Sequence, residues 1–198
     1  MMDQIKEWDR ELLVLLNSYH ADWLDPIMYI ITQTWFWIPF YIFLLYLIIR
    51  NYKKDSWLII VVLVVLLIMA DQITSTFMKP YFGRFRPSQE PSLHDILHIV
   101  NDYRGGLYGF ASGHAANTFA AATFSWLLFR KKYAWTSLFF LWAAIMTYTR
   151  IYLGLHYPGD ILVGGFIGAL LGWLCFVFFS WVEPRIKRRA QSSAVPPP

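Results

Sequence analysis

An arginine, a histidine and an aspartate stand close together in the stretch TRIYLGLHYPGD, residues 149–160, between two strongly apolar segments. Arg150 precedes His156 by six residues, and Asp160 follows it by four. Ionisable side chains beside hydrocarbon are unfavourable and usually mark a pathway or a reactive site. A carboxylate four residues beyond a histidine can accept one ring N–H, fix the tautomer and make the other nitrogen more nucleophilic. The pattern predicts His156 as a nucleophile with Asp160 as its partner.

A second cluster, ASGHAANT, covers residues 111–118. Ser112 is predicted to cap a helix that Gly113 and His114 open. The free N–H groups of a helix N-terminus favour an anion, and glycine lets the backbone approach a ligand closely. On a different segment from His156, His114 can protonate a leaving oxygen.

The third cluster, KPYFGRFRP, covers residues 79–87 and supplies Lys79 and Arg86. With Arg150 they place three positive charges around the expected anion, and the guanidinium fork suits phosphate because it binds two oxygens at once. A nucleophilic histidine, a positioned acid and a basic cradle together predict phosphoryl transfer through a phosphohistidine, with no metal or other cofactor.

Composition sets the class of protein that must position these residues. Of 198 residues, 57% are hydrophobic and 15% are charged, and a soluble domain of this size cannot bury so much apolar surface. Several apolar runs reach about 18 residues, a length that can span a bilayer. We expect an all-α, polytopic transmembrane helix bundle in one domain, residues 1–189, followed by a disordered tail at 190–198.

The apolar runs predict five spans and an N-terminal interfacial helix. Residues 3–19 carry apolar side chains at helical spacing with charges between them, which is typical of an amphipathic helix on a membrane surface. The spans are predicted at 26–49, 57–78, 113–129, 134–150 and 159–182. The polar TQT at 32–34 and Pro39 predict a tilt or kink in the first span. In the last span, glycine at every fourth position predicts a close helix-packing face: Gly164, Gly168 and Gly172.

Lysine and arginine in the short loops predict the orientation. Ten of the seventeen basic residues would share one side, which we expect to be cytoplasmic: Arg50, Lys53, Lys54, Arg130, Lys131, Lys132, Arg185, Lys187, Arg188 and Arg189. The loop 79–112 and the turn 150–160 then lie on the outer side. The three clusters are therefore expected to meet at the outer mouth of the bundle.

Taken in order, these clusters resemble the type 2 phosphatidic acid phosphatase superfamily, which includes bacterial membrane lipid phosphatases. The motifs are Lys79-x6-Arg86-Pro87, then Ser112-Gly113-His114, then Arg150-x5-His156-x3-Asp160. The resemblance implies His156 as nucleophile, Asp160 as its partner, His114 as general acid and no metal. It also implies that five residues bind phosphate: Lys79, Arg86, Ser112, Gly113 and Arg150. Ala111 stands where the family usually has proline and Thr149 where it has serine, and neither change removes a reactive group.

Other polar residues have several interpretations. Asp71 is expected to orient or neutralise Lys79, or to satisfy neighbours such as Asn117, and Arg84 to contact phosphate or a lipid headgroup. The histidines of HDILH, 94–98, are four residues apart, a spacing that can bind zinc on a helix. A surface lid helix over the substrate is the favoured alternative for that segment, because no third metal ligand is evident nearby.

The sequence therefore predicts a metal-independent lipid phosphatase in a bacterial inner membrane, with its active site facing the periplasm. Undecaprenyl diphosphate is the first candidate substrate, with phosphatidylglycerophosphate, phosphatidate and lipid A as alternatives. The expected partners are a lipid phosphate and the bilayer, with no nucleic acid. An anion transporter would use the same charges to bind phosphate without turnover, and a vanadate-dependent oxidase is a third alternative.

Overall fold

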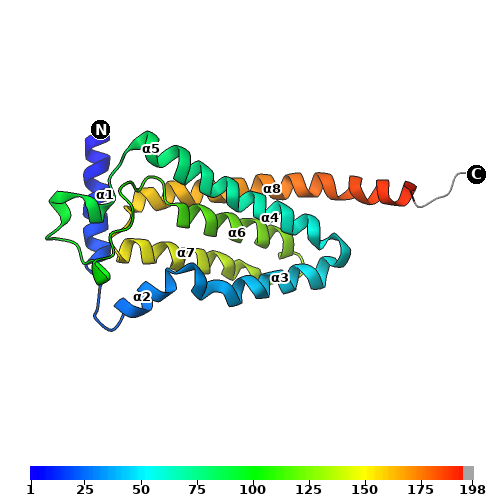
Figure 1. Cartoon of the computed structure of the whole chain (residues 1–198), viewed down its shortest axis with the longest axis horizontal. Coiled ribbons are helices and arrows are strands. Elements are labelled where there is room, and N and C mark those ends of the chain that lie inside the picture. The colour runs from blue at the N-terminus through cyan, green and yellow to red at the C-terminus, as the bar shows by residue number, and fades with distance from the viewer. Residues whose placement is uncertain (194–198) are drawn as a thin grey trace, which may run out of the picture.

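The computed structural model describes the backbone of residues 1–193 and the side chains of residues 1 and 3–186. Long helices lie side by side, and another helix crosses one end of the bundle (Figure 1). The α-helices are α1 (Met2–Asn17), α2 (Asp25–Ile31), α3 (Ile38–Tyr52), α4 (Ser56–Asp71), α5 (Lys79–Phe82), α6 (Gly113–Phe129), α7 (Leu138–Tyr152) and α8 (Pro158–Ser193). The prediction of an all-α bundle is confirmed. Of the predicted disordered tail, residues 194–198 lie outside the described residues.

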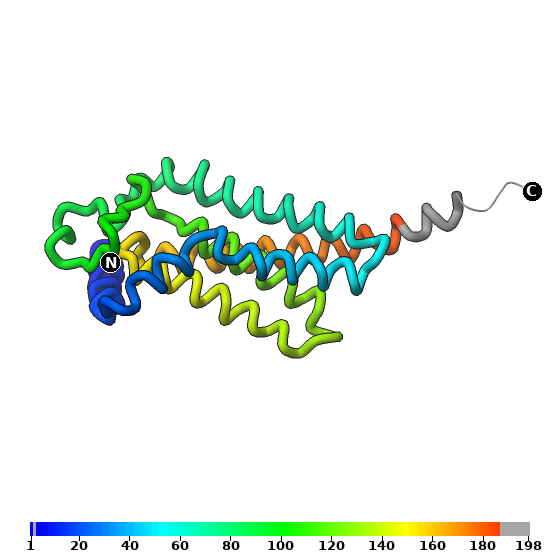
Figure 2. Tube along the Cα trace, turned by 60° about the horizontal axis from the view of Figure 1, so that its bottom comes forward, coloured from blue at the N-terminus to red at the C-terminus, as the bar shows by residue number. Residues whose placement is uncertain are grey.

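The helices α3, α4, α6, α7 and α8 run along the bundle (Figures 1 and 2). By length and composition, two continuous helical stretches within the described residues can cross a membrane, Thr34–Phe82 and Pro158–Ile186. The first includes both α3 and α4, which the short turn η2 (Lys53–Asp55) joins into a hairpin. The predicted first span is interrupted, because α2 ends at Ile31 and the 3-10 turn η1 (Thr34–Trp37) precedes α3. The kink expected near residues 32–34 is therefore present.

The helix α1 crosses the end of the bundle at which the chain begins, and α8 extends toward the other end (Figure 1). Leu13 and Asn17 of α1 are buried against the protein. An apolar stripe at helical spacing is exposed on α1: Ile5, Trp8, Leu12 and Leu15. A helix with one apolar face left open and another packed on the protein fits the predicted interfacial helix.

The second span reaches further than predicted. After α4 the helix widens into a π-helix, η3 (Gln72–Met78), and continues through α5 to Phe82. Proline in a regular helix clashes with the carbonyl four residues earlier, and the wider turn stands just before Pro80. Gly83 then ends the helix with φ +55°. The outer loop thus covers 83–112, and the expectation that it begins at Lys79 is wrong.

The helices α6 and α8 pack with their backbones in close contact. A Cβ on Gly164 would overlap the carbonyl oxygen of Ser112, and one on Gly172 would lie 2.6 Å from that of Ala120. The predicted glycine packing face is therefore present. Its result is that the start of α6 lies against the first turns of α8, so that the second and third motifs come together.

Candidate active site

The third motif forms a tight turn between α7 and α8. The carbonyl of Arg150 accepts hydrogen bonds from the backbone N–H groups of Leu155 and His156, at 2.9 and 3.3 Å. Gly154 makes the reversal possible with φ +66°. Arg150, His156 and Asp160 are each at most 4% exposed. The six-and-four spacing thus produces a buried turn that presents all three side chains at one end of the bundle.

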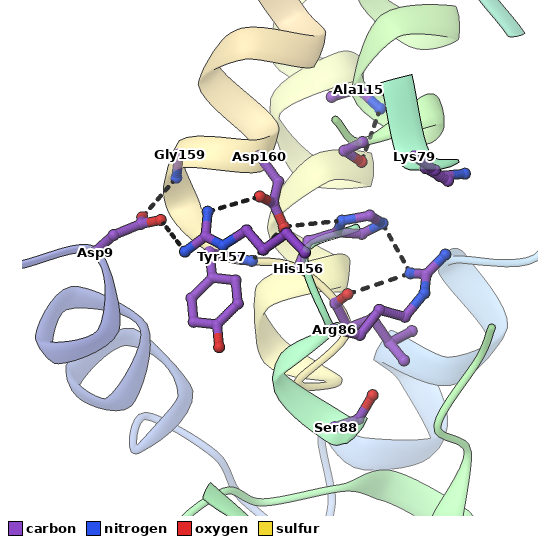
Figure 3. A network of polar contacts seen from close by, with 12 residues as sticks. Asp9, Lys79, Arg86, Ser88, Ala115, His156, Tyr157, Gly159 and Asp160 are labelled. Carbon is purple, nitrogen blue, oxygen red and sulfur yellow. Dashed lines mark hydrogen bonds and ion pairs between the residues drawn. The ribbon is translucent and has the colours of Figure 1, made fainter. Parts of the chain in front are cut away.

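The tautomer of His156 follows from its neighbours (Figure 3). Its Nε2 lies 2.9 Å from Nη1 of Arg86. A guanidinium only donates, so Nε2 must accept and the ring proton belongs on Nδ1. Nδ1 faces Oδ2 of Asp160 at 3.4 Å. The lone pair of Nε2 therefore points toward the basic residues, and Asp160 stands behind the ring.

The pKa of His156 favours the neutral ring. Burial, together with the positive charges of Arg86, Arg150 and Lys79, holds this pKa well below its usual range. Desolvation and nearby cations both disfavour a protonated imidazole. At neutral pH the ring therefore keeps the lone pair that a nucleophile needs.

Asp160 is fixed by three further contacts. Its Oδ2 accepts the backbone N–H of Tyr157 at 3.0 Å, and its Oδ1 accepts Nη1 of Arg84 at 2.9 Å. The first contact is one half of a capping box, since Asp160 is the third residue of α8. Its backbone carbonyl also accepts the N–H of Ser112 at 3.0 Å. Arg84 thus contacts the carboxylate of Asp160. The sequence suggests a contact with phosphate or a lipid headgroup instead.

Three cations line the other side of His156, and each is held from a different element. Nη1 of Arg86 donates to the carbonyl of Leu155 at 3.2 Å, and Nη1 of Arg150 donates to Oγ1 of Thr32 at 2.7 Å. Among the described residues, the buried Nε atoms of Arg86 and Arg150 have no hydrogen-bond partner. Buried N–H donors without partners are uncommon, and they fit a site that takes an anion.

Lys79 is oriented by the π-helix η3. Its Nζ donates to Oγ of Ser75 at 3.0 Å, and that hydroxyl donates to Oδ1 of Asp71 at 3.1 Å. Asp71 therefore acts on Lys79 through a serine. The same segment approaches the start of α6, where a Cβ on Gly113 would lie 3.3 Å from Oγ of Ser75.

The N-terminus of α6 completes the anion side of the site. Oγ of Ser112 accepts the N–H of Ala115 at 3.4 Å, which makes Ser112 the predicted cap. His114 lies within electrostatic range of both Arg150 and His156. It also borders a cavity of about 330 Å³ inside the bundle, together with Asn117, Trp142 and Met146. His114 is thus close to the cradle and to a space that can accept the rest of a substrate.

The zinc interpretation of HDILH lacks support. The 3-10 turn η5 (Pro91–Leu93) is followed by a turn and irregular backbone at residues 94–98. The predicted lid helix is therefore absent from this segment. Nε2 of His98 lies 2.9 Å from the carboxylate of Asp25, and His94 is exposed. Within the described part of the chain, no three His, Cys, Asp or Glu side chains are grouped as metal ligands.

Sequence reasoning missed three supporting residues. Thr32 supports Arg150, Ser75 links Lys79 to Asp71, and Asp9 of α1 accepts Nη2 of Arg84 at 2.7 Å. Thr32 could have been found from its place in the polar TQT run. Asp9 could have been found because it is an acidic residue on a face of α1 that the apolar stripe does not occupy.

Comparison with known proteins agrees with this geometry. The family model described as the PAP2 superfamily matches residues 60–184. Over 100% of this chain, the sequence is 40% identical to a lipid A 4'-phosphatase of Bacteroides thetaiotaomicron, of which it covers 86%. It is 36% identical to a lipid A 4'-phosphatase of Porphyromonas gingivalis, over 93% of this chain and 78% of that protein.

A solved structure shares the fold. The transmembrane PAP2-type phosphatidylglycerolphosphate phosphatase of Bacillus subtilis matches with a TM-score of 0.68 and 20% identity, over 90% of this chain and 88% of that one. The helices therefore follow the arrangement of a membrane phosphatase. Together with the family match over most of the sequence and two relatives above 30% identity, this means that the chain belongs to the PAP2 superfamily and is an integral membrane lipid phosphatase.

Proposed function

We infer that this phosphatase removes a phosphate from lipid A, through a phosphohistidine on His156. Two lipid A 4'-phosphatases align with nearly the whole chain, and they favour lipid A over undecaprenyl diphosphate, the first candidate from sequence. The observation that carries the mechanism is the orientation of His156, with Nε2 toward Arg86 and Nδ1 toward Asp160.

The first half of the reaction forms the phosphohistidine. Nε2 of His156 attacks phosphorus, the bond from phosphorus to the leaving oxygen breaks, and His114 gives that oxygen a proton. Asp160 stabilises the Nδ1 proton of the ring as positive charge develops. Arg86, Arg150 and the N–H groups at the start of α6 stabilise the phosphoryl oxygens.

The second half releases phosphate. Water attacks phosphorus, its proton passes to His114, and the bond from phosphorus to Nε2 breaks. His114 thereby returns to its protonated form and His156 to its neutral form. His114, which gives the leaving oxygen its proton, lines the cavity, so this space suits the sugar or the root of an acyl chain.

The active site is proposed to face the periplasm from the bacterial inner membrane. Arg50 in the last turn of α3, and Lys53 and Lys54 in the turn between α3 and α4, lie at the end of the bundle opposite α1 (Figure 1). Positive residues remain mainly on the cytoplasmic side. A lipid in the outer leaflet can then keep its acyl chains in the bilayer while its phosphate enters the cradle.

The experiment that tests the substrate is phosphate release by the purified protein in detergent with excess EDTA. The panel contains lipid A, undecaprenyl diphosphate, phosphatidylglycerophosphate and phosphatidate, and His156→Ala is the control. We expect lipid A to be turned over fastest, with mass spectrometry locating the lost phosphate at the 4' or the 1 position. Faster turnover of another lipid contradicts the lipid A assignment, and activity retained in His156→Ala contradicts the nucleophile.

A second experiment tests the orientation. Asp102 lies in the outer loop with its side chain 80% exposed, and Lys53 lies at the other end. In a Cys175→Ser background, we expect Asp102→Cys to react with a membrane-impermeant thiol reagent in intact spheroplasts and Lys53→Cys to react only after lysis. The reverse pattern contradicts a periplasmic site.

A further inference from the structure

Asp9 connects the interfacial helix α1 directly to the active site (Figure 3). Its Oδ2 accepts Nη2 of Arg84 at 2.7 Å, and its Oδ1 accepts the backbone N–H of Gly159 at 2.7 Å. The side chain of Asp9 is only 13% exposed. An N-terminal residue thus binds two groups that are 75 and 150 positions away in the chain.

Arg84 is the link between Asp9 and the catalytic pair. One of its terminal nitrogens contacts Asp9, and the other contacts Oδ1 of Asp160 at 2.9 Å. Its guanidinium carbon also lies 3.7 Å from the centre of the Tyr157 ring. Because the planar fork is held on two edges and one face, its orientation toward Asp160 is defined.

Gly159 leaves just enough room for Asp9. A Cβ on this residue would lie 2.9 Å from Oδ2 of Asp9 and 3.2 Å from its Oδ1. The carboxylate therefore occupies the space where any other residue would place a side chain. Its contact with the N–H of Gly159 satisfies one of the unpaired donors in the first turn of α8.

Two different anchors hold α1 in place. The apolar stripe that includes Trp8 and Leu12 is left open for the membrane interface. On the inner face, Nδ2 of Asn17 donates to the carbonyls of Tyr152 at 2.8 Å and His98 at 3.1 Å. Asp9 lies between these anchors, so the docking of α1 sets its position.

We propose that Asp9 is a positioning residue for the phosphatase reaction, acting through Arg84 on Asp160. This proposal rests on the roles inferred above for His156 and Asp160. Asp9 shares the charge of Arg84 and holds its fork, so that Arg84 contacts only Oδ1 of Asp160 and leaves Oδ2 to His156 and the backbone N–H of Tyr157. Without Asp9 the fork is free to bind both oxygens, which draws Oδ2 away from a ring nitrogen already 3.4 Å distant.

The test is the turnover of Asp9→Asn in the full-length protein, with the best lipid phosphate of the wild type. Asparagine keeps an oxygen for Gly159 but places N–H donors against Arg84. We expect kcat to fall about tenfold because the nucleophile loses alignment, while KM stays within about twofold because the phosphate ligands are untouched. Glu11→Gln removes the same charge from an exposed position of α1 and is expected to leave both constants unchanged.

Two further variants separate positioning from folding. Gly159→Ala introduces a better helix former but displaces Asp9, so we expect a similar loss of kcat at an unchanged or higher Tm. In an Arg84→Gln background, Asp9→Asn is expected to cause less than a twofold further loss, because the link is already broken. A tenfold loss that persists there, or a change in KM alone, overturns the proposal.

The same assays separate failure of this proposal from failure of the mechanism. His156→Ala and Asp160→Asn are measured beside Asp9→Asn. If both lose activity and Asp9→Asn does not, the role of Asp9 is wrong and the mechanism stands. If His156→Ala or Asp160→Asn keeps wild-type activity, the inferred mechanism is wrong, and the proposal falls with it.

Discussion

The two halves of the active site differ in how completely the protein satisfies them. On the nucleophile side, His156 and Asp160 have partners on both ring nitrogens and both carboxylate oxygens. On the anion side, Arg86 and Arg150 each keep a buried Nε without a partner among the described residues. The proposed nucleophile is therefore already oriented by the protein, whereas the proposed phosphate cradle keeps donors for an anion.

This contrast has a physical reason. The nucleophile must have the right tautomer and direction at the moment of attack, and fixed hydrogen bonds supply both. The cradle must hold an anion, and donors already satisfied by the protein would be unavailable to it. Repulsion among Lys79, Arg86 and Arg150 is the stability cost of that arrangement, because no acidic side chain among the described residues forms an ion pair with any of them.

The largest expected effect separates the halves by removing the nucleophile alone. We expect His156→Asn to lower kcat by at least about a thousandfold, because no other group can form the covalent intermediate. Inorganic phosphate should still raise the Tm of this variant, since the cradle remains. His94→Asn, at an exposed position, is the control. Loss of phosphate stabilisation in His156→Asn would mean that the two halves are not separable.

The second effect comes from the opposite change, in which the cradle is broken and the nucleophile kept. Arg150→Met keeps much of the side-chain volume but removes a buried cation. We expect turnover to fall about a hundredfold and the stabilisation by phosphate to disappear. Without phosphate, the Tm should rise by about 2–4 °C because repulsion in the cradle is relieved. A lower Tm would contradict the view that the empty cradle is strained.

The sequence predicts the residues of both halves of the site. It predicts the contacts within the nucleophile half in more detail than those that hold the cradle. The spans, the helix start at Gly113 and the convergence of three motifs at one end follow from apolar run lengths and from the spacing of residues near in sequence. The donors of the cradle follow from the same motifs. Apart from Asp71, which is expected to orient Lys79, the sequence does not predict the partners that orient them.

These partners come from distant parts of the chain. Thr32 and Arg150 are 118 positions apart, and Asp9 and Gly159 are 150 apart. No local periodicity records such contacts, because they depend on how the helices pack. The π-helix η3, which directs Ser75 toward Lys79, likewise follows from a local conflict at Pro80 that hydrophobic patterning cannot reveal.

A smaller effect tests the support of the cradle. In Thr32→Val the side chain keeps its shape but loses the oxygen that accepts Nη1 of Arg150. A hydrogen bond to a charged group contributes about 1.5–3 kcal/mol, so we expect KM to rise about tenfold while kcat changes less. Thr136→Val is the matched control, because Thr136 is equally buried but bonds only the carbonyl of Tyr133. An unchanged KM would show that Arg150 is held without Thr32.

The smallest effect concerns the protonation of the nucleophile. Burial, with the charges of Arg86, Arg150 and Lys79, holds the pKa of His156 well below its usual range in the folded protein, whereas the unfolded chain takes up that proton near pH 6.5. Since the unfolded state then binds more protons, the stability that the neutral ring provides is present above about pH 6.5 and is lost as the pH falls, by up to about 1.4 kcal/mol per unit.

The measurement is the Tm in detergent between pH 7 and pH 5. We expect a steeper fall in wild type than in His156→Asn, because the variant has no ring to protonate on unfolding. His94→Asn, at an exposed position outside the active site, should keep the wild-type slope. Equal slopes in all three proteins would mean that folded His156 accepts a proton as readily as a solvated histidine. In that case the orientation of Nε2 toward Arg86 would not persist in solution, and the nucleophile half would be no more preorganised than the cradle.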